Sequence, residues 1–184
     1  MMPYDPVGSV NAAPPARSIP FWLAIAGALL IGGAALVWGL LDARQPVNDI
    51  APNFALTSYD GTSYQLNSLR GKVIVLHFWA TWCGPCRSET PGFEDLWLRL
   101  KGQDVIFLGV DQDDKLDDAH AFIKQFSVVY PNGPDNGIIS AYRVQGLPTT
   151  IIIDQKGLVA ARILAAADPN DLQARIEALL NKPT

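Results

Sequence analysis

The hydrophobic residues divide the chain into one long apolar run near the N-terminus and a region where apolar and polar stretches alternate. Residues 19–41 form the run, with 23 positions free of charge and Trp22 and Trp38 near its two ends. At about 1.5 Å per residue, such a helix spans the roughly 30 Å core of a bilayer, and tryptophan favours the headgroup level. The run therefore predicts one transmembrane helix.

A cleaved signal peptide is the alternative, but its apolar core would be about 7 to 15 residues long. Residues 1–18 contain four prolines and no apolar period, which predicts a disordered tail. Residues 42–49 are predicted to form a polar linker, and residues 50–184 a folded domain. Arg17 and Arg44 flank the apolar run, so charge hardly distinguishes the two orientations. We expect the tail to be cytoplasmic and the domain to be extracytoplasmic.

Strand-like patterns begin after the linker. Two short runs within residues 54–66 surround Asp60–Gly61, a common hairpin turn, and predict an N-terminal β-hairpin. Residues 72–79 are apolar and β-branched without polar alternation, as in a central strand covered on both faces. Residues 104–110 have the same character. The pattern therefore predicts a sheet that is buried on both sides.

Helices are predicted where apolar residues recur three or four positions apart, at residues 87–100, 117–126 and 168–180. We expect Asp117 or Asp118 to cap the second helix and Asp168 to cap the third. Two more strands are predicted within residues 148–164, joined at Asp154–Gly157. This order predicts an α/β fold with a mixed sheet and helices on both faces.

Length and charge limit the possible functions. The chain has 184 residues, of which 49% are hydrophobic, and a net charge of -4. This size fits one domain plus a short additional segment. The chain lacks the excess of Lys and Arg that phosphate contacts require, which argues against nucleic acid as a partner. We expect a protein or small-molecule partner and no bound cofactor.

Cys83 and Cys86 are the only cysteines, and two residues separate them. A structural zinc site usually needs four ligands, and the chain adds only two histidines, His77 and His120. A disulfide across so short a loop removes little entropy from the unfolded chain, so a purely structural bridge is a weak explanation. The spacing therefore favours a redox pair and no metal site.

A second candidate metal site is the acidic run of residues 111–118. Leu116 and Phe122 stand where a calcium-binding EF-hand loop requires glycine and glutamate. We therefore interpret the run as a solvated loop that leads into a helix.

The position of the cysteines predicts their roles. A strand that ends just before a helix places Cys83 at the helix N-terminus, where free N–H groups and the helix dipole favour a thiolate. Cys83 is then the nucleophile. Cys86 lies about one turn further along, close enough for a disulfide and more shielded. It would attack the mixed disulfide and release the reduced partner.

The motifs "WCGPC" and "GLPTT", together with Pro91 five residues after Cys86, resemble those of the thioredoxin superfamily. The predicted hairpin, the sequence "WATWCGPCRSETP" and the predicted anchor narrow the resemblance to one group within this superfamily. The chain is similar to membrane-anchored thiol-disulfide oxidoreductases of the TlpA, ResA and cytochrome c maturation type. The resemblance extends over residues 50–180.

The resemblance implies a substrate site beside the cysteines. Pro148 should follow a cis peptide bond, and the backbone of Leu147 should pair with an extended substrate peptide as an added strand would. Thr149 follows in the same segment, and Trp82 should form an apolar rim for the substrate protein. The dipeptide Gly84–Pro85 is that of reducing thioredoxins and favours reduction over oxidation or isomerisation.

His77 and Glu89 have two interpretations each. Thioredoxins carry a buried acid at the position of His77, where an imidazole could relay a proton; we favour the alternative of a histidine hydrogen-bonded in the core. Glu89 matches a glutamate that ResA-like proteins hold near their cysteines, where it could accept the proton of Cys86 and raise thiol pKa values. It could equally be a solvated acid early in a helix.

The resemblance predicts a reductase of disulfides in exported proteins, among them apocytochromes c, that receives electrons from a membrane thiol donor. Two other functions compete with it. A peroxiredoxin-like peroxidase should carry threonine or serine three residues before its reactive cysteine, where this chain has Ala80. A Cu(I)-binding chaperone could use both thiolates, but no cluster of methionine or histidine would complete such a site.

Overall fold

The structure is a computed structural model that describes residues 48–112 and 114–182. The predicted tail, the predicted transmembrane helix and all of the linker up to residue 47 lie outside the described residues. Within the described part, no helix combines the length and apolar character needed to cross a bilayer.

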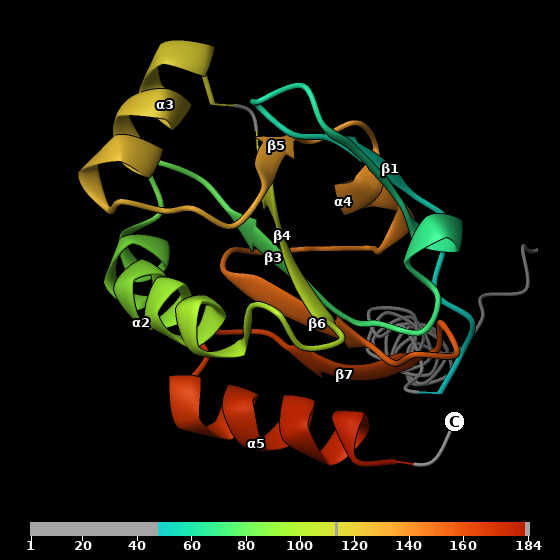
Figure 1. Ribbon diagram of the computed structural model, residues 1–184. Helices are drawn as coiled ribbons and strands as arrows, with labels where there is room; N and C mark the ends of the chain where they lie inside the picture. The colour runs from blue at the N-terminus through green and yellow to red at the C-terminus, as the bar shows by residue number, and fades with distance from the viewer. Residues whose placement is uncertain (1–47, 113, 183–184) are drawn as a thin grey trace, which may run out of the picture. The chain divides into compact units, whose positions relative to one another are not determined.

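The described elements follow one another along the chain as strands, helices and one 3-10 helix (Figure 1). They are β1 (Ala55–Thr57), β2 (Ser63–Gln65), η1 (Leu66–Leu69), β3 (Val73–Trp79), α2 (Gly84–Leu100), β4 (Val105–Asp111), α3 (Leu116–Gln125), β5 (Asn132–Pro134), α4 (Ile138–Ala141), β6 (Thr149–Ile153), β7 (Val159–Ile163) and α5 (Pro169–Leu180).

The main sheet has five strands in the order β5-β4-β3-β6-β7. β3 pairs in parallel with β4 and antiparallel with β6, and β7 pairs antiparallel with β6. This confirms the predicted mixed α/β sheet. A separate two-stranded sheet joins β1 and β2 in antiparallel register, with Asp60 and Gly61 between them.

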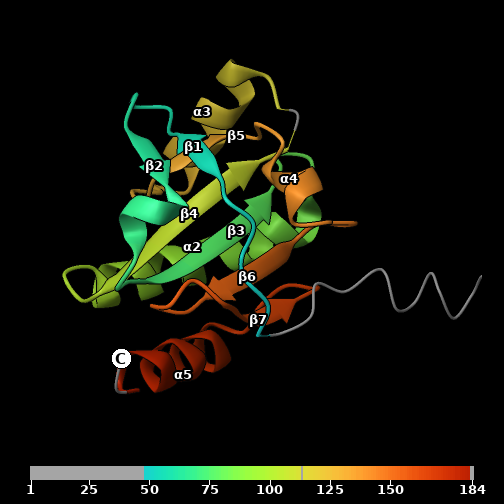
Figure 2. The same cartoon turned by 90° about the vertical axis from the view of Figure 1, so that its right-hand side faces the viewer.

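β3 is the central strand, and all seven of its residues are buried. Ile74, Leu76 and Phe78 belong to a core cluster formed with β1, η1 and α4. Val73 and Val75 belong to a second cluster formed with α2 and α5. In Figure 2, β1, β2 and α4 accordingly lie in front of the sheet and α2 lies behind it. Helices therefore cover both faces, as the uninterrupted apolar strand predicts.

The helix ends agree with two of the predicted signals and contradict one. Cys83 is the N-cap of α2, and Asp168 caps α5 by accepting hydrogen bonds from two backbone N–H groups of the first turn. The predicted cap at Asp117 or Asp118 is wrong. The backbone of Lys115 is extended and α3 begins at Leu116, so both aspartates lie inside its first turn. There they still interact favourably with the helix dipole.

A third cluster closes the end of the sheet where β3 leads into α2. It contains the two cysteines together with residues of β3, its following turn and α3, namely Trp79, Ala80, Ala119 and Phe122. Leu147, from the loop before β6, packs against it. The fold thus brings three separate segments of the chain to the cysteines.

Candidate active site

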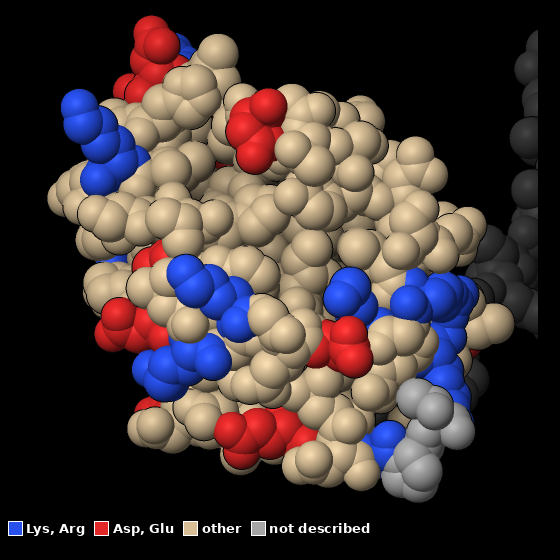
Figure 3. Space-filling view, in the orientation of Figure 1, with Lys and Arg blue, Asp and Glu red and all other residues tan. Residues whose placement is uncertain are grey.

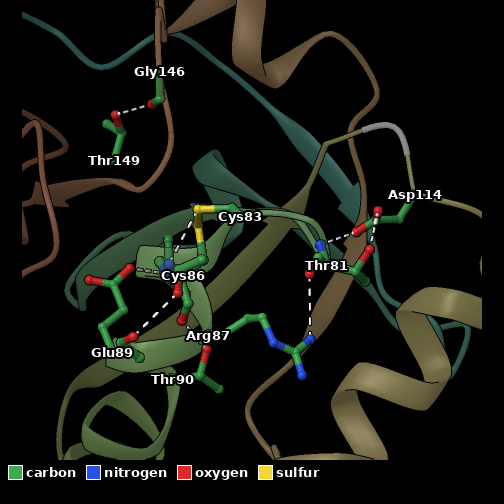
Figure 4. Close-up of a disulfide and its surroundings, with 12 residues drawn as sticks. Thr81, Cys83, Cys86, Arg87, Glu89, Thr90, Asp114, Gly146 and Thr149 are labelled. Carbon is green, nitrogen blue, oxygen red and sulfur yellow. Dashed lines mark hydrogen bonds and ion pairs between the residues drawn. A yellow bond between two sulfur atoms is a disulfide. The ribbon is translucent and has the colours of Figure 1, made fainter.

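Cys83 and Cys86 form a disulfide with an S–S distance of 2.02 Å (Figure 4). The backbone N–H of Cys86 donates a hydrogen bond to Cys83 Sγ over 3.2 Å, which makes the Cys83 side chain the cap of α2. Cys86 is completely buried, whereas Cys83 retains a small exposed area. The predicted order of accessibility is therefore found in the structure.

The turn before Cys83 is held from two sides. Asp114 accepts hydrogen bonds from the N–H and the hydroxyl of Thr81, both over 2.6 Å. Arg87 donates to the Thr81 carbonyl over 3.4 Å, and its guanidinium lies over the rings of Phe122 and Phe126. None of these contacts was predicted from the sequence. From the sequence, Asp114 was predicted only to lie in a solvated loop. Its partner Thr81 is 33 residues away, so no local pattern connects the two residues.

The loop before β6 lies beside the cysteines. The Leu147-Pro148 peptide bond is cis, as the resemblance implies. Thr149 donates a hydrogen bond from its hydroxyl to the Gly146 carbonyl over 2.8 Å, and its backbone pairs with Phe78 of β3 (Figure 4). Since Leu147 also packs against the cysteine cluster, the structure brings this loop and the disulfide together.

The remaining predicted contact residues lie on the surface. Trp82 is 66% exposed although it directly precedes a buried cysteine. Gly84 and Pro85, in the first turn of α2, are also exposed. An exposed tryptophan next to the disulfide is compatible with the predicted apolar rim.

His77 and Glu89 are in direct contact. His77 Nε2 lies 2.9 Å from Glu89 Oε1, and His77 Nδ1 lies 3.0 Å from the Tyr130 hydroxyl. Glu89 Oε2 accepts a hydrogen bond from the Ala167 N–H over 2.8 Å. Glu89 is only 6% exposed, so its interpretation as a solvated acid is wrong. His77 is fully buried and hydrogen-bonded, as the core interpretation predicts, whereas a relay role stays a prediction.

Two tyrosines near the site stay protonated. Burial, followed by the hydrogen bond to Asp111, raises the pKa of Tyr59 far above its ordinary value, and its hydroxyl donates to Asp111 over 2.5 Å. Burial, followed by the charges of Glu94 and Glu89, raises the pKa of Tyr130 in the same direction. Both hydroxyls are therefore hydrogen-bond donors at neutral pH.

Known proteins resemble this chain over most of the described domain. The AhpC/TSA family matches residues 47–162. A thiol-disulfide oxidoreductase ResA of Bacillus cereus is 34% identical over 136 residues, which cover 73% of this chain and 79% of that protein. ResA of Bacillus subtilis is 36% identical over 111 residues, or 59% and 62% of the two chains.

Solved structures agree with this assignment. A thiol:disulfide interchange protein of the thioredoxin family from Chlorobium tepidum superposes with a TM-score of 0.68 at 26% identity, over 75% of this chain and all of that one. The sheet order, the cis proline beside the disulfide and the matched sequences give one conclusion. The chain belongs to the AhpC/TSA family and, within it, to the thiol-disulfide oxidoreductases of the ResA type.

Proposed function

We propose that this thiol-disulfide oxidoreductase reduces disulfides of exported proteins through the dithiol of Cys83 and Cys86. The observation that carries the proposal is the hydrogen bond from the Cys86 N–H to Cys83 Sγ at the start of α2. In the reduced protein the same N–H and the helix dipole favour a thiolate on Cys83. The shielded Cys86 then serves as the resolving thiol.

The reaction transfers two electrons to the substrate. The Cys83 thiolate attacks one sulfur of the substrate disulfide, and the other substrate sulfur leaves as a thiolate. Cys86 loses its proton, for which Glu89 is the proposed acceptor, and attacks Cys83 Sγ. The second substrate sulfur leaves with its electron pair, and the Cys83–Cys86 disulfide remains. A membrane thiol donor is proposed to reduce this disulfide again.

The surface beside Cys83 supports a protein substrate. We propose that the backbone of Leu147 pairs with an extended substrate segment, with Pro148 and Thr149 positioning that backbone and Trp82 packing against the substrate. Gly84 and Pro85 would lie under the attacked disulfide. Figure 3 shows a broad area over α4 and the neighbouring loops that is almost free of Lys, Arg, Asp and Glu side chains. α4 precedes the loop that carries Leu147 and Pro148, and a substrate segment would have few charged groups to desolvate on this area.

The entry point of the chain supports the proposed arrangement at a membrane. Asn48 and Asp49 exchange backbone hydrogen bonds with Val159 at the start of β7. Val159 pairs with Ile153, which pairs with Ile74 near the start of β3, whereas Cys83 follows the end of β3. The chain thus enters the domain at the end of the sheet opposite the disulfide. With residues 19–41 proposed as the anchor and the domain on the extracytoplasmic side, Cys83 stays accessible to exported proteins such as apocytochromes c.

Two cysteine variants test the proposal in an insulin-disulfide reduction assay. Cys83→Ser should abolish reduction, because the nucleophile is lost. Cys86→Ser should form a mixed disulfide with the substrate that it cannot resolve. Reduction that persists in Cys83→Ser would refute the assignment of the nucleophile.

The direction of the reaction can be determined by measuring the reduction potential of the full-length protein. The protein is titrated against glutathione or dithiothreitol, and tryptophan fluorescence follows its redox state. A midpoint near or below about -230 mV would support a reductase. A midpoint near about -120 mV would instead indicate an oxidant that uses the same residues.

The competing functions are less well supported by the site. Ala80 lies three residues before Cys83 and is fully buried, so a peroxidase would lack a hydroxyl at that position. Peroxide consumption at a rate above that of disulfide exchange would support the peroxidase. Stoichiometric Cu(I) binding by the reduced protein would support the chaperone.

A further inference from the structure

The strongest unassigned feature is a buried chain of polar side chains behind the cysteines. It joins Tyr130, which precedes β5, to His77 at the centre of β3 and to Glu89 on α2 through the contacts of 3.0 and 2.9 Å described above. The imidazole also stacks on the Phe93 ring, with centroids 4.3 Å apart. Packing and hydrogen bonds therefore fix the orientation of the imidazole.

One distribution of protons satisfies every member of this chain. The Tyr130 hydroxyl donates to His77 Nδ1, the His77 Nε2–H donates to Glu89 Oε1, and the Ala167 N–H donates to Glu89 Oε2. The raised pKa of Tyr130 keeps its hydroxyl a donor. Each oxygen of the buried Glu89 side chain then receives one hydrogen bond.

Other titratable groups near Tyr130, His77 and Glu89 lie on α2 and at the start of α5. Glu94 lies on α2 and acts on Tyr130 by its charge, and the two cysteines lie at the start of the same helix. Asp168 is the cap of α5 and already accepts the hydrogen bonds of that cap. Of these groups, Glu89 is the carboxylate that contacts His77.

Glu89 is one of the residues that line a groove at the surface. The groove has a volume of about 370 Å³ and is lined by Ser88, Glu89, Gly92 and residues 166–169. It therefore runs between α2 and the segment that leads into α5. A volume of this size holds several water molecules, at roughly 30 Å³ each. Glu89 thus contacts His77 and also lines the groove, although only 2% of its side chain is exposed.

We propose that His77 is a positioning residue that holds Glu89 as the internal proton acceptor of Cys86, and that the groove carries the proton to water. The proposal rests on the proposed function. Glu89 lies one helical turn after Cys86. The Cys86 thiol gives its proton to the Glu89 carboxylate, and the resulting thiolate attacks Cys83 Sγ. The substrate sulfur leaves with its electron pair, and the protonated Glu89 loses its proton to water in the groove. His77 keeps its own proton throughout.

The test separates the two thiol steps with dithiobis(nitrobenzoate) and the reduced full-length protein. Attack by Cys83 releases one coloured thiolate, and attack by Cys86 on the mixed disulfide releases the second, so stopped-flow absorbance shows two phases. Glu89→Gln should slow the second phase by about tenfold or more, the scale of a lost proton acceptor, and leave the first phase unchanged.

A matched pair of substitutions tests His77. In His77→Gln the amide nitrogen replaces Nε2 and can still donate to Glu89, so the second phase should stay near the wild-type rate. In His77→Asn the shorter amide replaces Nδ1 only, so the second phase should slow as in Glu89→Gln. In a Glu89→Gln background, His77→Asn should have no further effect.

Three outcomes would overturn the proposal. Equal rates for His77→Gln and His77→Asn would show that the donor to Glu89 is irrelevant. A full effect of His77→Asn in the Glu89→Gln background would indicate a purely structural role. A second phase that is as slow in Tyr130→Phe, which retains the Nε2 contact, as in His77→Asn would assign the effect to general damage and not to the donor. If Cys83→Ser reacted in the first phase, the proposed function itself would fail.

A second matched pair of substitutions tests the groove. Ala166 lines it and is exposed, whereas its exposed neighbour Ala165 does not line it. Ala166→Phe should fill part of the groove and slow the second phase several-fold, while Ala165→Phe should not. Equal behaviour of the two variants would refute the groove as the route of the proton.

Discussion

Asp114 binds Thr81 twice, through the backbone N–H and the side-chain hydroxyl, across the gap between the β4–α3 loop and the turn that precedes Cys83. A charged acceptor with two donors at 2.6 Å forms strong hydrogen bonds, each contributing about 1.5 to 3 kcal/mol. This contact connects the active-site turn to a loop that carries no reacting group. We infer that it holds the turn from which Cys83 begins α2.

Asp114→Ala should loosen this turn. We expect the protein to stay folded, to lose about 3 kcal/mol of unfolding free energy, the low end of the range for two such bonds, and to show a several-fold lower kcat/KM for disulfide reduction. Thr81→Val removes the hydroxyl donor but keeps the N–H donor, so it should have roughly half the effect on stability. Urea denaturation and the insulin assay measure both quantities. Unchanged activity in Asp114→Ala would contradict a positioning role.

Gly109 is required by the packing behind Trp79. A Cβ atom at Gly109 would lie 1.8 Å from Asn132 Oδ1, the atom that accepts the hydrogen bond of the Trp79 indole. Because Asn132 is buried and bonded, it has no free direction in which to move. Gly109→Ala should therefore reduce the unfolding free energy by about 1 to 3 kcal/mol, as overpacking does.

Gly146→Ala is the control for that substitution, since a Cβ there meets no atom within 4 Å. It should leave the unfolding free energy nearly unchanged. Equal losses in the two variants, measured by thermal or urea denaturation, would show that the contact with Asn132 is not the cause.

Glu94 should make stability depend on pH. It is buried on α2 and accepts a hydrogen bond from the Val129 N–H over 2.9 Å. Burial is the largest cause that raises its pKa, so the folded protein binds this proton more tightly than the unfolded chain does. Its contribution is therefore complete below the unfolded value of about 4.3 and is lost as the pH rises through the folded value.

Glu94→Gln should not show this loss, because its side chain is neutral at every pH. The unfolding free energy of Glu94→Gln relative to wild type should increase as the pH rises from about 4 and level off above the folded pKa of Glu94. Urea denaturation at several pH values measures the difference. Glu177→Gln, an exposed change on α5, should show no such trend, and a flat difference for Glu94→Gln would contradict the prediction.

Asp168 should stabilise α5 as its N-cap. Its Oδ1 accepts hydrogen bonds from the N–H groups of Asn170 and Asp171 over 2.8 and 3.2 Å. Asp168→Ala should cost about 1 kcal/mol of unfolding free energy. Asp171→Ala, which removes an exposed ion pair with Arg175, should cost less, about 0.5 kcal/mol. A larger loss in Asp171→Ala would assign the stability of this helix to the ion pair.

The sequence by itself determined the features that depend on neighbouring residues. The uninterrupted apolar run predicted β3, because a strand covered on both faces has no solvated side to carry polar residues. The strand-to-helix junction placed Cys83 at the N-terminus of α2, and Asp168 was identified as a cap, because both signals lie within one helical turn. The resemblance correctly added the cis bond before Pro148.

Only the tertiary structure decided the polar contacts behind and beside the disulfide. His77 and Glu89 lie 12 residues apart on a strand and a helix, and Thr81 and Asp114 lie 33 residues apart in two loops. These contacts form only when β3, α2 and α3 pack together. The residues next to a side chain in the sequence do not specify its partners in such contacts. For the same reason the sequence could not exclude that Glu89 is a solvated acid. The structure buries its side chain, and a buried polar group needs partners such as the hydrogen bonds to His77 and Ala167.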